Sequence, residues 1–240
     1  MTLTPACSLR CPRVFPSPGW TERASEGQVQ QDLTAAIARH GAPTILGHKA
    51  GSLFLWQTSC PHPEEVVGAM DDGLACHGVR VLLMGRCPSG CRIYVYRPAL
   101  LRPILQQEEA AELLRGAGYA HQDEGAVREL QLRLLAGGSF PHEIGLFLGY
   151  PLADVQGFIR HGGANCLLSG CWKVYDNPDR AARLFALYHR CTRTCMALLT
   201  KGVSLAALAG LHPTVTRCSA SAGAASHRSE NDSIHRRVPS

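Results

Sequence analysis

The chain of 240 residues carries 24 basic and 19 acidic residues, for a formal net charge of +5, and 45% of its residues are hydrophobic, which is enough to build a core. The charge excess lies largely in the two ends, because residues 1–26 carry +1 and residues 212–240 carry +2, which leaves +2 for residues 27–211. A central part this close to neutral does not favour a nucleic acid or another polyanion as partner.

The expected compartment follows from hydropathy and from the cysteines. No run of about eighteen apolar residues exists, and the first twenty residues lack the apolar centre of a signal peptide. The sequence therefore predicts a cytosolic protein without a membrane span. Eleven cysteines is a high and odd number, and in the cytosol they are expected to be reduced thiols or metal ligands rather than a disulfide framework.

The N-terminal part of the chain predicts an extension, a helix and a first strand. Residues 1–26 are rich in Pro, Ser and Arg without apolar periodicity and are expected to be disordered. Apolar residues recur at helical spacing over residues 28–40, up to a break at Gly41 and Pro43. The short apolar run within residues 52–57 is typical of a strand.

A helix and a hairpin are predicted next. Pro63 and the two glutamates that follow it favour a helix start, and the helix is expected to run over residues 63–76. Two β-rich runs at residues 79–85 and 92–97 flank a turn sequence of Gly, Pro and Ser. That pattern indicates a β-hairpin.

From Pro98 onwards the pattern is mainly helical, with one more strand at residues 171–175. Helices are predicted at residues 100–114, 127–135, 178–201 and 203–211. This order predicts an α+β fold, with a small mixed sheet of three to four strands and a helix-rich C-terminal half. Residues 27–211 are expected to form a single globular domain, and residues 212–240 a disordered tail.

The stretch at residues 140–161 contains the candidate site. Pro141 at a helix start would place His142 and Glu143 in the first turn, where unpaired backbone N–H groups create a positive field. That field favours the neutral imidazole, which suits a metal ligand or a general base. We predict a small-ligand or metal site here, with His142 as acid or base and Glu143 as its orienting partner or a second ligand. The alternative is a structural His beside a capping Glu.

The apolar positions of the same stretch also fit a helix-turn-helix, with Gly149 at the turn. The second helix offers only Arg160 and His161 as cations and carries Asp154, which is a poor complement for phosphate. We therefore predict a packed αα corner. A non-enzymatic regulatory or adaptor module that uses residues 141–161 stays open as an alternative function; a protein partner is compatible with it, whereas a nucleic acid is disfavoured.

These motifs together resemble a known family. They are the run Phe-Pro-His-Glu-Ile-Gly-Leu-Phe-Leu-Gly-Tyr-Pro at residues 140–151, the run Gly-Cys-Trp-Lys-Val-Tyr at residues 170–175, and Lys49, Tyr96-Arg97, Gly118-Tyr119 and Cys191-Thr192. The sequence resembles domain-of-unknown-function family 3793 of anaerobic Firmicutes, over roughly residues 28–210. The resemblance implies a bacterial cytosolic protein and brings no reaction, ligand or catalytic residue.

Cysteines occur in close pairs, among them Cys166 with Cys171 and Cys191 with Cys195. Two pairs brought together would form a tetrahedral zinc site or hold an iron–sulfur cluster, so zinc or iron is the metal to consider and a thiol or metal redox protein is a further alternative. No pair has the two-residue spacing of a zinc knuckle, and cysteines on a helix face are commonly core residues. Ordinary thiols are the competing interpretation.

Lys173, Tyr175 and Tyr150 are the predicted wall residues of the ligand site, with Lys173 supplying a cation to an anionic ligand near His142. A solvated lysine is the competing interpretation. The sequence contains no phosphate loop, dinucleotide-binding glycine motif, nucleophile elbow or HExxH helix. NTPases, Rossmann oxidoreductases, α/β-hydrolases and zincins are therefore disfavoured. The sequence predicts binding of an unidentified small molecule and leaves both an enzyme and a binding protein open.

Overall fold

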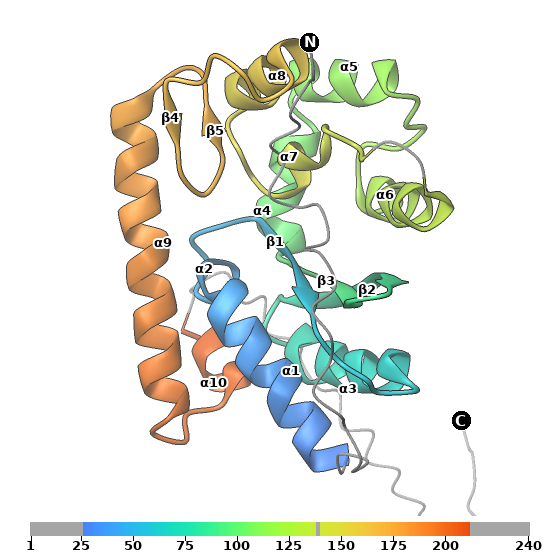
Figure 1. Cartoon of the computed structure of the whole chain (residues 1–240), viewed down its shortest axis with the longest axis vertical. Helices are drawn as coiled ribbons and strands as arrows, with labels where there is room; N and C mark the ends of the chain where they lie inside the picture. Colours follow the sequence, from blue (N-terminus) through green and yellow to red (C-terminus); the bar gives the residue numbers. More distant parts are fainter. Residues whose placement is uncertain (1–25, 138–139, 212–240) are drawn as a thin grey trace, which may run out of the picture.

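The computed structural model describes residues 26–137 and 140–211 (Figure 1). The predicted extension and the predicted tail at residues 212–240 lie outside these residues, apart from Glu26, at which α1 begins. The helices are α1 (Glu26–His40), α2 (Ala42–Ile45), α3 (Pro63–Ala75), α4 (Pro98–Leu105), α5 (Glu108–Gly116), α6 (Glu124–Ala136), α7 (Ile144–Phe147), α8 (Leu152–His161), α9 (Pro178–Leu199) and α10 (Leu205–Ala209). The strands are β1 (Gly51–Trp56), β2 (Arg80–Cys87), β3 (Gly90–Tyr96), β4 (Leu168–Ser169) and β5 (Lys173–Val174).

Three strands form the main sheet, in the order β1-β3-β2. The central strand β3 is antiparallel to both neighbours, so that Ile93 faces Phe54 on one side and Leu83 on the other. The α+β class, the hairpin and the first three predicted strands are confirmed. The sheet is antiparallel, however, and not mixed.

The predicted fourth strand lies elsewhere. β5 pairs with β4 in a separate two-stranded sheet, in which Leu168 lies opposite Val174. The amide of Gly170 donates to the carbonyl of Trp172 at 3.1 Å and closes a tight turn between the two strands. Pairing with a partner only a few residues away orders this segment without a place in the main sheet.

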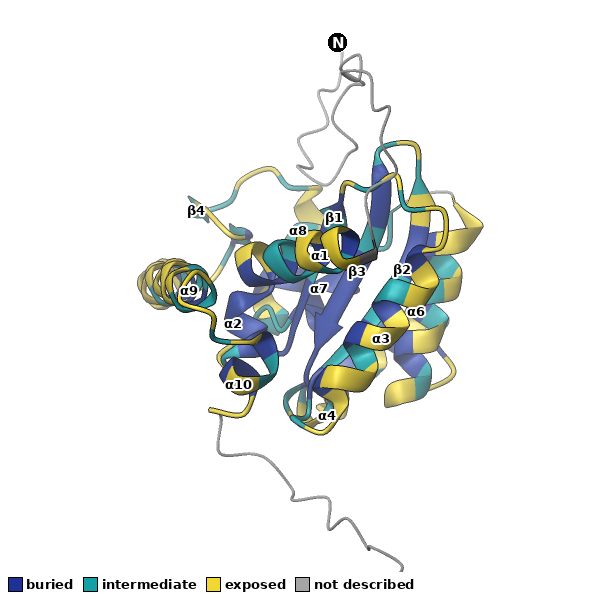
Figure 2. Ribbon diagram, turned by 90° about the horizontal axis from the view of Figure 1, so that it is seen from below, coloured by how far each residue is buried: buried dark blue, intermediate teal, exposed yellow. Residues whose placement is uncertain are grey.

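Both faces of the main sheet are buried, each by its own set of helices (Figure 2). Phe54 and Ile93 on one face pack with α1, α2, α3, α10 and the C-terminal half of α9. Met84 and Tyr94 on the other face pack with α4 to α8. Successive residues of a strand point to opposite faces, so adjacent Ile93 and Tyr94 belong to different cores. Figure 2 shows the dark blue strands between helices with yellow outer surfaces.

A smaller apolar cluster lies where the two-stranded sheet meets the N-terminal half of α9 (Figure 1). It contains Trp172, Val174, Ala181 and Tyr188. The partly buried Tyr150 packs against both this cluster and the α4–α8 core. The ring of Tyr150 thus connects the small sheet to the rest of the molecule.

Arg97, directly after β3, joins three helix ends. Its side chain is only 2% exposed and donates to the carbonyls of Thr44 at 2.8 Å, His77 at 3.1 Å and Ala209 at 2.9 Å, and also to that of Ile45. These carbonyls lie at the C-terminal ends of α2, α3 and α10. The guanidinium therefore supplies a charged donor to carbonyls at these helix ends, of which that of Thr44 also accepts from the Gly47 amide.

The predicted αα corner is present between α7 and α8. A Cβ on Gly145 would lie 2.7 Å from Cγ2 of Val155, so glycine permits the close contact of the two helices. α7 is only four residues long and wholly buried. Asp154 of α8 points inward, because it is 3% exposed and accepts from Trp172 Nε1 at 2.7 Å and from the Tyr175 amide at 2.6 Å. The helix-turn-helix spacing is core architecture.

Candidate functional site

A pocket of about 740 Å³ lies beside residues 140–143. Its walls come from the C-terminal ends of α5 and α6, from Phe140 to Glu143, and from Ile159 of α8. His142 and Glu143 both line it, as does Arg133 of α6. The structure thus places the two residues of the predicted site at a pocket, and adds a cation that was not predicted.

The helix start at Pro141 was predicted one turn too early. Pro141 to Glu143 form a turn whose carbonyls accept from residues three positions on, as in Ile144 N to Pro141 O and Gly145 N to His142 O, both at 3.3 Å. α7 begins at Ile144, and Glu143 is its N-cap residue without a side-chain capping bond. The carboxylate of Glu143 is therefore free to point elsewhere.

Glu143 is a mostly buried carboxylate, with 8% of its surface exposed. The Tyr119 hydroxyl donates to its Oε1 at 3.1 Å. Burial, followed by the negative charge of Glu143, raises the pKa of Tyr119, so the hydroxyl remains protonated and can donate at all ordinary pH values.

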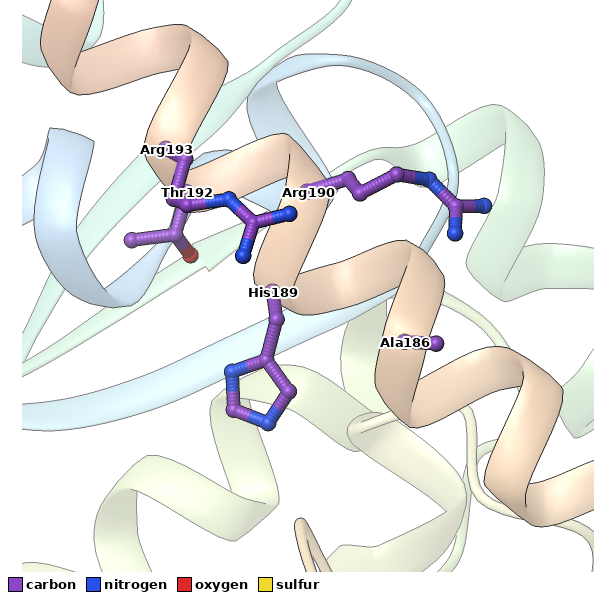
Figure 3. Close-up of a pocket in the computed structure, with 5 residues that line it drawn as sticks. All are labelled: Ala186, His189, Arg190, Thr192 and Arg193. Carbon is purple, nitrogen blue, oxygen red and sulfur yellow. The ribbon is translucent and has the colours of Figure 1, made fainter.

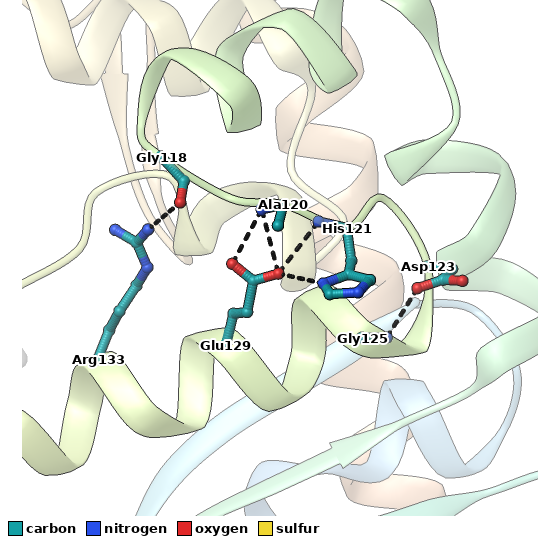
Figure 4. A network of polar contacts seen from close by, with 7 residues as sticks. All are labelled: Gly118, Ala120, His121, Asp123, Gly125, Glu129 and Arg133. Atoms are coloured by element: carbon teal, nitrogen blue, oxygen red, sulfur yellow. Dashed lines mark hydrogen bonds and ion pairs between the residues drawn. The ribbon is translucent and has the colours of Figure 1, made fainter.

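The loop that carries Tyr119 is fixed to α6 by polar contacts (Figure 4). Glu129 accepts from the amides of Ala120 and His121 and from His121 Nδ1, the last at 2.6 Å. Arg133 donates to the Gly118 carbonyl at 2.8 Å, and its guanidinium lies 4.1 Å from the centre of the Tyr119 ring. Glu129 and Arg133 of α6 therefore hold the loop and the ring of Tyr119 in place beside the pocket, and the same contacts fix Arg133.

His142 and Glu143 do not form the predicted pair. His142 is exposed, and its ring makes a T-shaped contact with that of Phe158 at a centroid distance of 5.0 Å. The hydrogen bond of Glu143 is with Tyr119, and among the described residues no ion pair joins Glu143 to His142. The orienting role predicted for Glu143 has no support from this geometry.

The three predicted wall residues lie away from this pocket. Tyr175 stacks on His161, with ring centroids 5.6 Å apart, and Lys173 is partly exposed on β5. Tyr150 stacks on Trp172 at 4.9 Å, and its hydroxyl donates to the Cys171 carbonyl at 3.4 Å. They therefore surround the small sheet and not His142.

The four cysteines predicted as metal ligands are not assembled into a metal site. Within residues 26–137 and 140–211, no three His, Cys, Asp or Glu side chains are placed to hold a metal ion. Cys191 and Cys195 lie in the core against the main sheet, whereas Cys171 is exposed beside the small one. Burial, followed by the neighbouring Cys191, raises the pKa of Cys195 to about 11, which opposes the thiolate form that metals require.

A second group of interacting side chains surrounds Lys49, in the loop between α2 and β1. Its Nζ lies 5.1 Å from the ring centre of Tyr150 and 5.8 Å from that of Tyr188. Burial lowers the pKa of Lys49 to about 8 and raises that of Tyr188 to about 12. Lys49 belongs to the residues of the family resemblance but to no predicted site, because the residues around it are about 100 or more positions away in the sequence.

Stability should depend on pH through Lys49. Its pKa is about 8 in the folded chain and near 10.5 in the unfolded one, so between these values the unfolded chain binds more protons. The free energy of unfolding should therefore rise between about pH 8 and pH 9.5 relative to that of a Lys49→Met variant. Urea denaturation of both proteins measures this difference. The tyrosines and thiols that both proteins share contribute equally to the two pH profiles, so their contributions cancel. Parallel pH profiles would contradict the assignment.

Another pocket, of about 520 Å³, lies along the outer face of α9 (Figure 3). Its described lining residues all come from this helix, and His189, Arg190 and Arg193 provide its polar groups. A surface of this kind attracts anions. It contacts a ligand from one side only, so it defines no geometry for recognition.

The comparison with known families supports the resemblance to a family of unknown function. A family model described as "Protein of unknown function (DUF3793)" matches residues 37–209, which is more than half of the chain. The chain belongs to this family. Among curated proteins and among solved structures, none matches it significantly. The DUF3793 match includes every described side chain of the pocket beside Glu143 and of the group around Lys49.

In the part of this DUF3793 chain that the structure describes, no helix has both the length and the apolarity needed to cross a bilayer.

Proposed function

We propose that the chain binds a small molecule in the pocket beside Glu143, through an amino group or another N–H donor of the ligand. The observation that carries the proposal is the carboxylate of Glu143, which is mostly buried and lines the pocket. Tyr119 donates to one of its oxygens, and no further hydrogen bond or ion pair to this carboxylate is found among the described residues. Buried carboxylates are normally paired, so a ligand donor at the second oxygen would complete the site.

The side chain of Arg133 indicates that the ligand also carries an anionic group. Its guanidinium lines the same pocket and is held in place by the Gly118 carbonyl and the ring of Tyr119. A guanidinium recognises carboxylate or phosphate through paired N–H groups. A pocket with one fixed anion and one fixed cation fits a small zwitterion, such as an amino acid or an amino-acid derivative.

His142 stands at the exposed edge of the pocket, where it could exchange a proton with a bound molecule. If the ligand reacts, His142 is the acid or base we would assign. We place the protein in the cytosol, and the eight described cysteines, all of which are free thiols, support that compartment.

The test uses the twenty common amino acids and their decarboxylated amines as probes, with thermal shift and ligand-observed NMR as measurements. We expect at least one zwitterion to raise the melting temperature of the wild-type chain, and Glu143→Gln to weaken its binding about tenfold or more, because a neutral amide replaces a charged acceptor. Glu112→Gln, an exposed substitution of the same type on α5, should bind like the wild type.

Arg133→Met separates the two halves of the site. It should weaken binding of the zwitterion more than binding of the corresponding amine, because only the zwitterion carries the anionic group. The proposal fails if no probe binds the folded chain, or if Glu143→Gln binds every probe with wild-type affinity.

A further inference from the structure

Lys49 is held in a fixed position by its neighbours in the chain. In the loop before it, the amides of Gly47 and His48 donate to the carbonyls of Thr44 at 3.1 Å and Pro43 at 2.7 Å. The residue after it, Ala50, is 5% exposed and accepts from the Arg97 amide at 2.9 Å. With both flanks anchored, the side chain of Lys49 has a limited range of directions.

Rings from two distant segments cover this side chain. Tyr150, at the α7–α8 corner, and Tyr188, on α9, both lie under the amine within cation–π distance. Tyr150 is backed in turn by the stacked ring of Trp172. The aromatic surface is therefore rigid, and it replaces much of the water that would hydrate an exposed lysine.

The amine has no counter-ion in the described part of the chain. Neither a carboxylate nor any other anion lies within ion-pair distance of Lys49. Of the titratable groups that face it, Tyr150, Tyr188 and Cys171, each has a raised pKa because of burial, so all three are neutral near pH 7. The ring faces and, to a smaller extent than burial, the nearby Cys171 favour the charged form of the lysine, but no ion pair offsets its loss of hydration.

We propose that Lys49 is the acyl-acceptor amine of this chain, the side chain that small activated acyl donors such as acyl phosphates modify first. The neutral amine nitrogen attacks the acyl carbon and forms an amide bond. The bond from that carbon to the phosphate oxygen breaks, phosphate leaves with the electron pair, and the surplus proton on nitrogen passes to water. No oxidant or reductant is required.

The state of the amine supports this choice. The ring faces favour the ammonium form, but the loss of hydration outweighs them and lowers the pKa of Lys49 to about 8. At pH 7.5 about a quarter of Lys49 is then neutral, against about one part in a thousand for an ordinary lysine. A less basic amine is also a weaker nucleophile in its neutral form. The acylation rate of Lys49 at pH 7.5 should therefore exceed that of an ordinary lysine by about tenfold.

The sequence provides its own controls, because it contains only two other lysines, Lys173 and Lys201. Lys173 is partly exposed and Lys201 is exposed. The full-length chain is treated with acetyl phosphate from pH 6.5 to 10, and the acetylation rate of each lysine is measured by peptide mass spectrometry. We expect Lys49 to react about tenfold faster than the other two at pH 7.5, with a pH–rate midpoint near 8.

Two further measurements exclude trivial explanations. In guanidinium chloride the three lysines should react at similar rates, which shows that the folded structure creates the difference. Tyr150→Ala, which removes the ring and opens the amine to water, should raise the midpoint of Lys49 towards the value of an exposed lysine, whereas Tyr150→Phe, which keeps the ring, should not. The proposal is overturned if Lys173 or Lys201 reacts as fast as Lys49 in the folded chain, or if the Lys49 midpoint lies above pH 10.

Discussion

Replacement of Arg97 by methionine is expected to lower the free energy of unfolding by about 3–5 kcal/mol, a large share of the stability of a domain of this size. The substitution leaves four buried carbonyls, at Thr44, Ile45, His77 and Ala209, without their charged donor. The Thr44 carbonyl keeps the Gly47 amide as a donor, and each acceptor that is left unsatisfied costs about 1–3 kcal/mol before relaxation. Urea denaturation followed by circular dichroism measures the loss.

The position of Arg97 explains why the effect should be this large. Burial lowers its pKa, yet among the described residues no carboxylate pairs with it. The negative ends of three helix dipoles, those of α2, α3 and α10, stabilise the guanidinium instead. Removing the cation therefore affects the core around Phe54 and Ile93 at three points, which lie between residues 44 and 209 of the sequence.

Two variants serve as controls. Arg97→Lys keeps the charge but offers a single nitrogen in place of the guanidinium fork, so it should recover only a minor part of the loss. Arg128→Met removes an exposed arginine from α6 and should change stability by less than about 0.5 kcal/mol. A loss below about 1 kcal/mol for Arg97→Met would show that the helix ends find other donors.

The main sheet could be predicted because its signals are local. The runs at residues 79–85 and 92–97 flank a turn sequence, and hairpin pairing follows from such neighbours without knowledge of the rest of the chain. The small sheet was assigned to the wrong partner for a related reason. A short strand at residues 171–175 is visible in the sequence, but its partner at 168–169 is too short to show a pattern of its own.

The candidate site could be predicted only in part. Pro141 indicated that His142 and Glu143 lie at a helix start, and the structure places both at a pocket. The partner of Glu143 is Tyr119, which lies 24 residues earlier, and no local pattern relates the two. Lys49 shows the same limit more strongly, because its surroundings depend on how α9 and the α7–α8 corner pack.

Asp154→Asn should be the second severe substitution, with a loss of about 2–4 kcal/mol in the free energy of unfolding. The sequence suggested Asp154 only as a poor complement for phosphate, whereas its carboxylate accepts from Trp172 Nε1 and from the amides of Tyr175 and Asp176. An asparagine would replace one acceptor oxygen by an NH₂ group that faces these donors. Urea denaturation, with tryptophan fluorescence as a second probe, measures the loss.

The same substitution tests whether the small sheet supports the Lys49 site. Asp154 holds Trp172, Trp172 stacks on Tyr150, and the ring of Tyr150 covers the amine of Lys49. Loosening the first contact should therefore hydrate the amine and raise the pKa of Lys49 from about 8, even though Asp154 has no recorded contact with the lysine. Asp72→Asn, an exposed substitution on α3, should alter neither the free energy of unfolding nor the pKa of Lys49. A stable Asp154→Asn variant with an unchanged Lys49 pH–rate midpoint would mean that Tyr150 is held by the α4–α8 core alone.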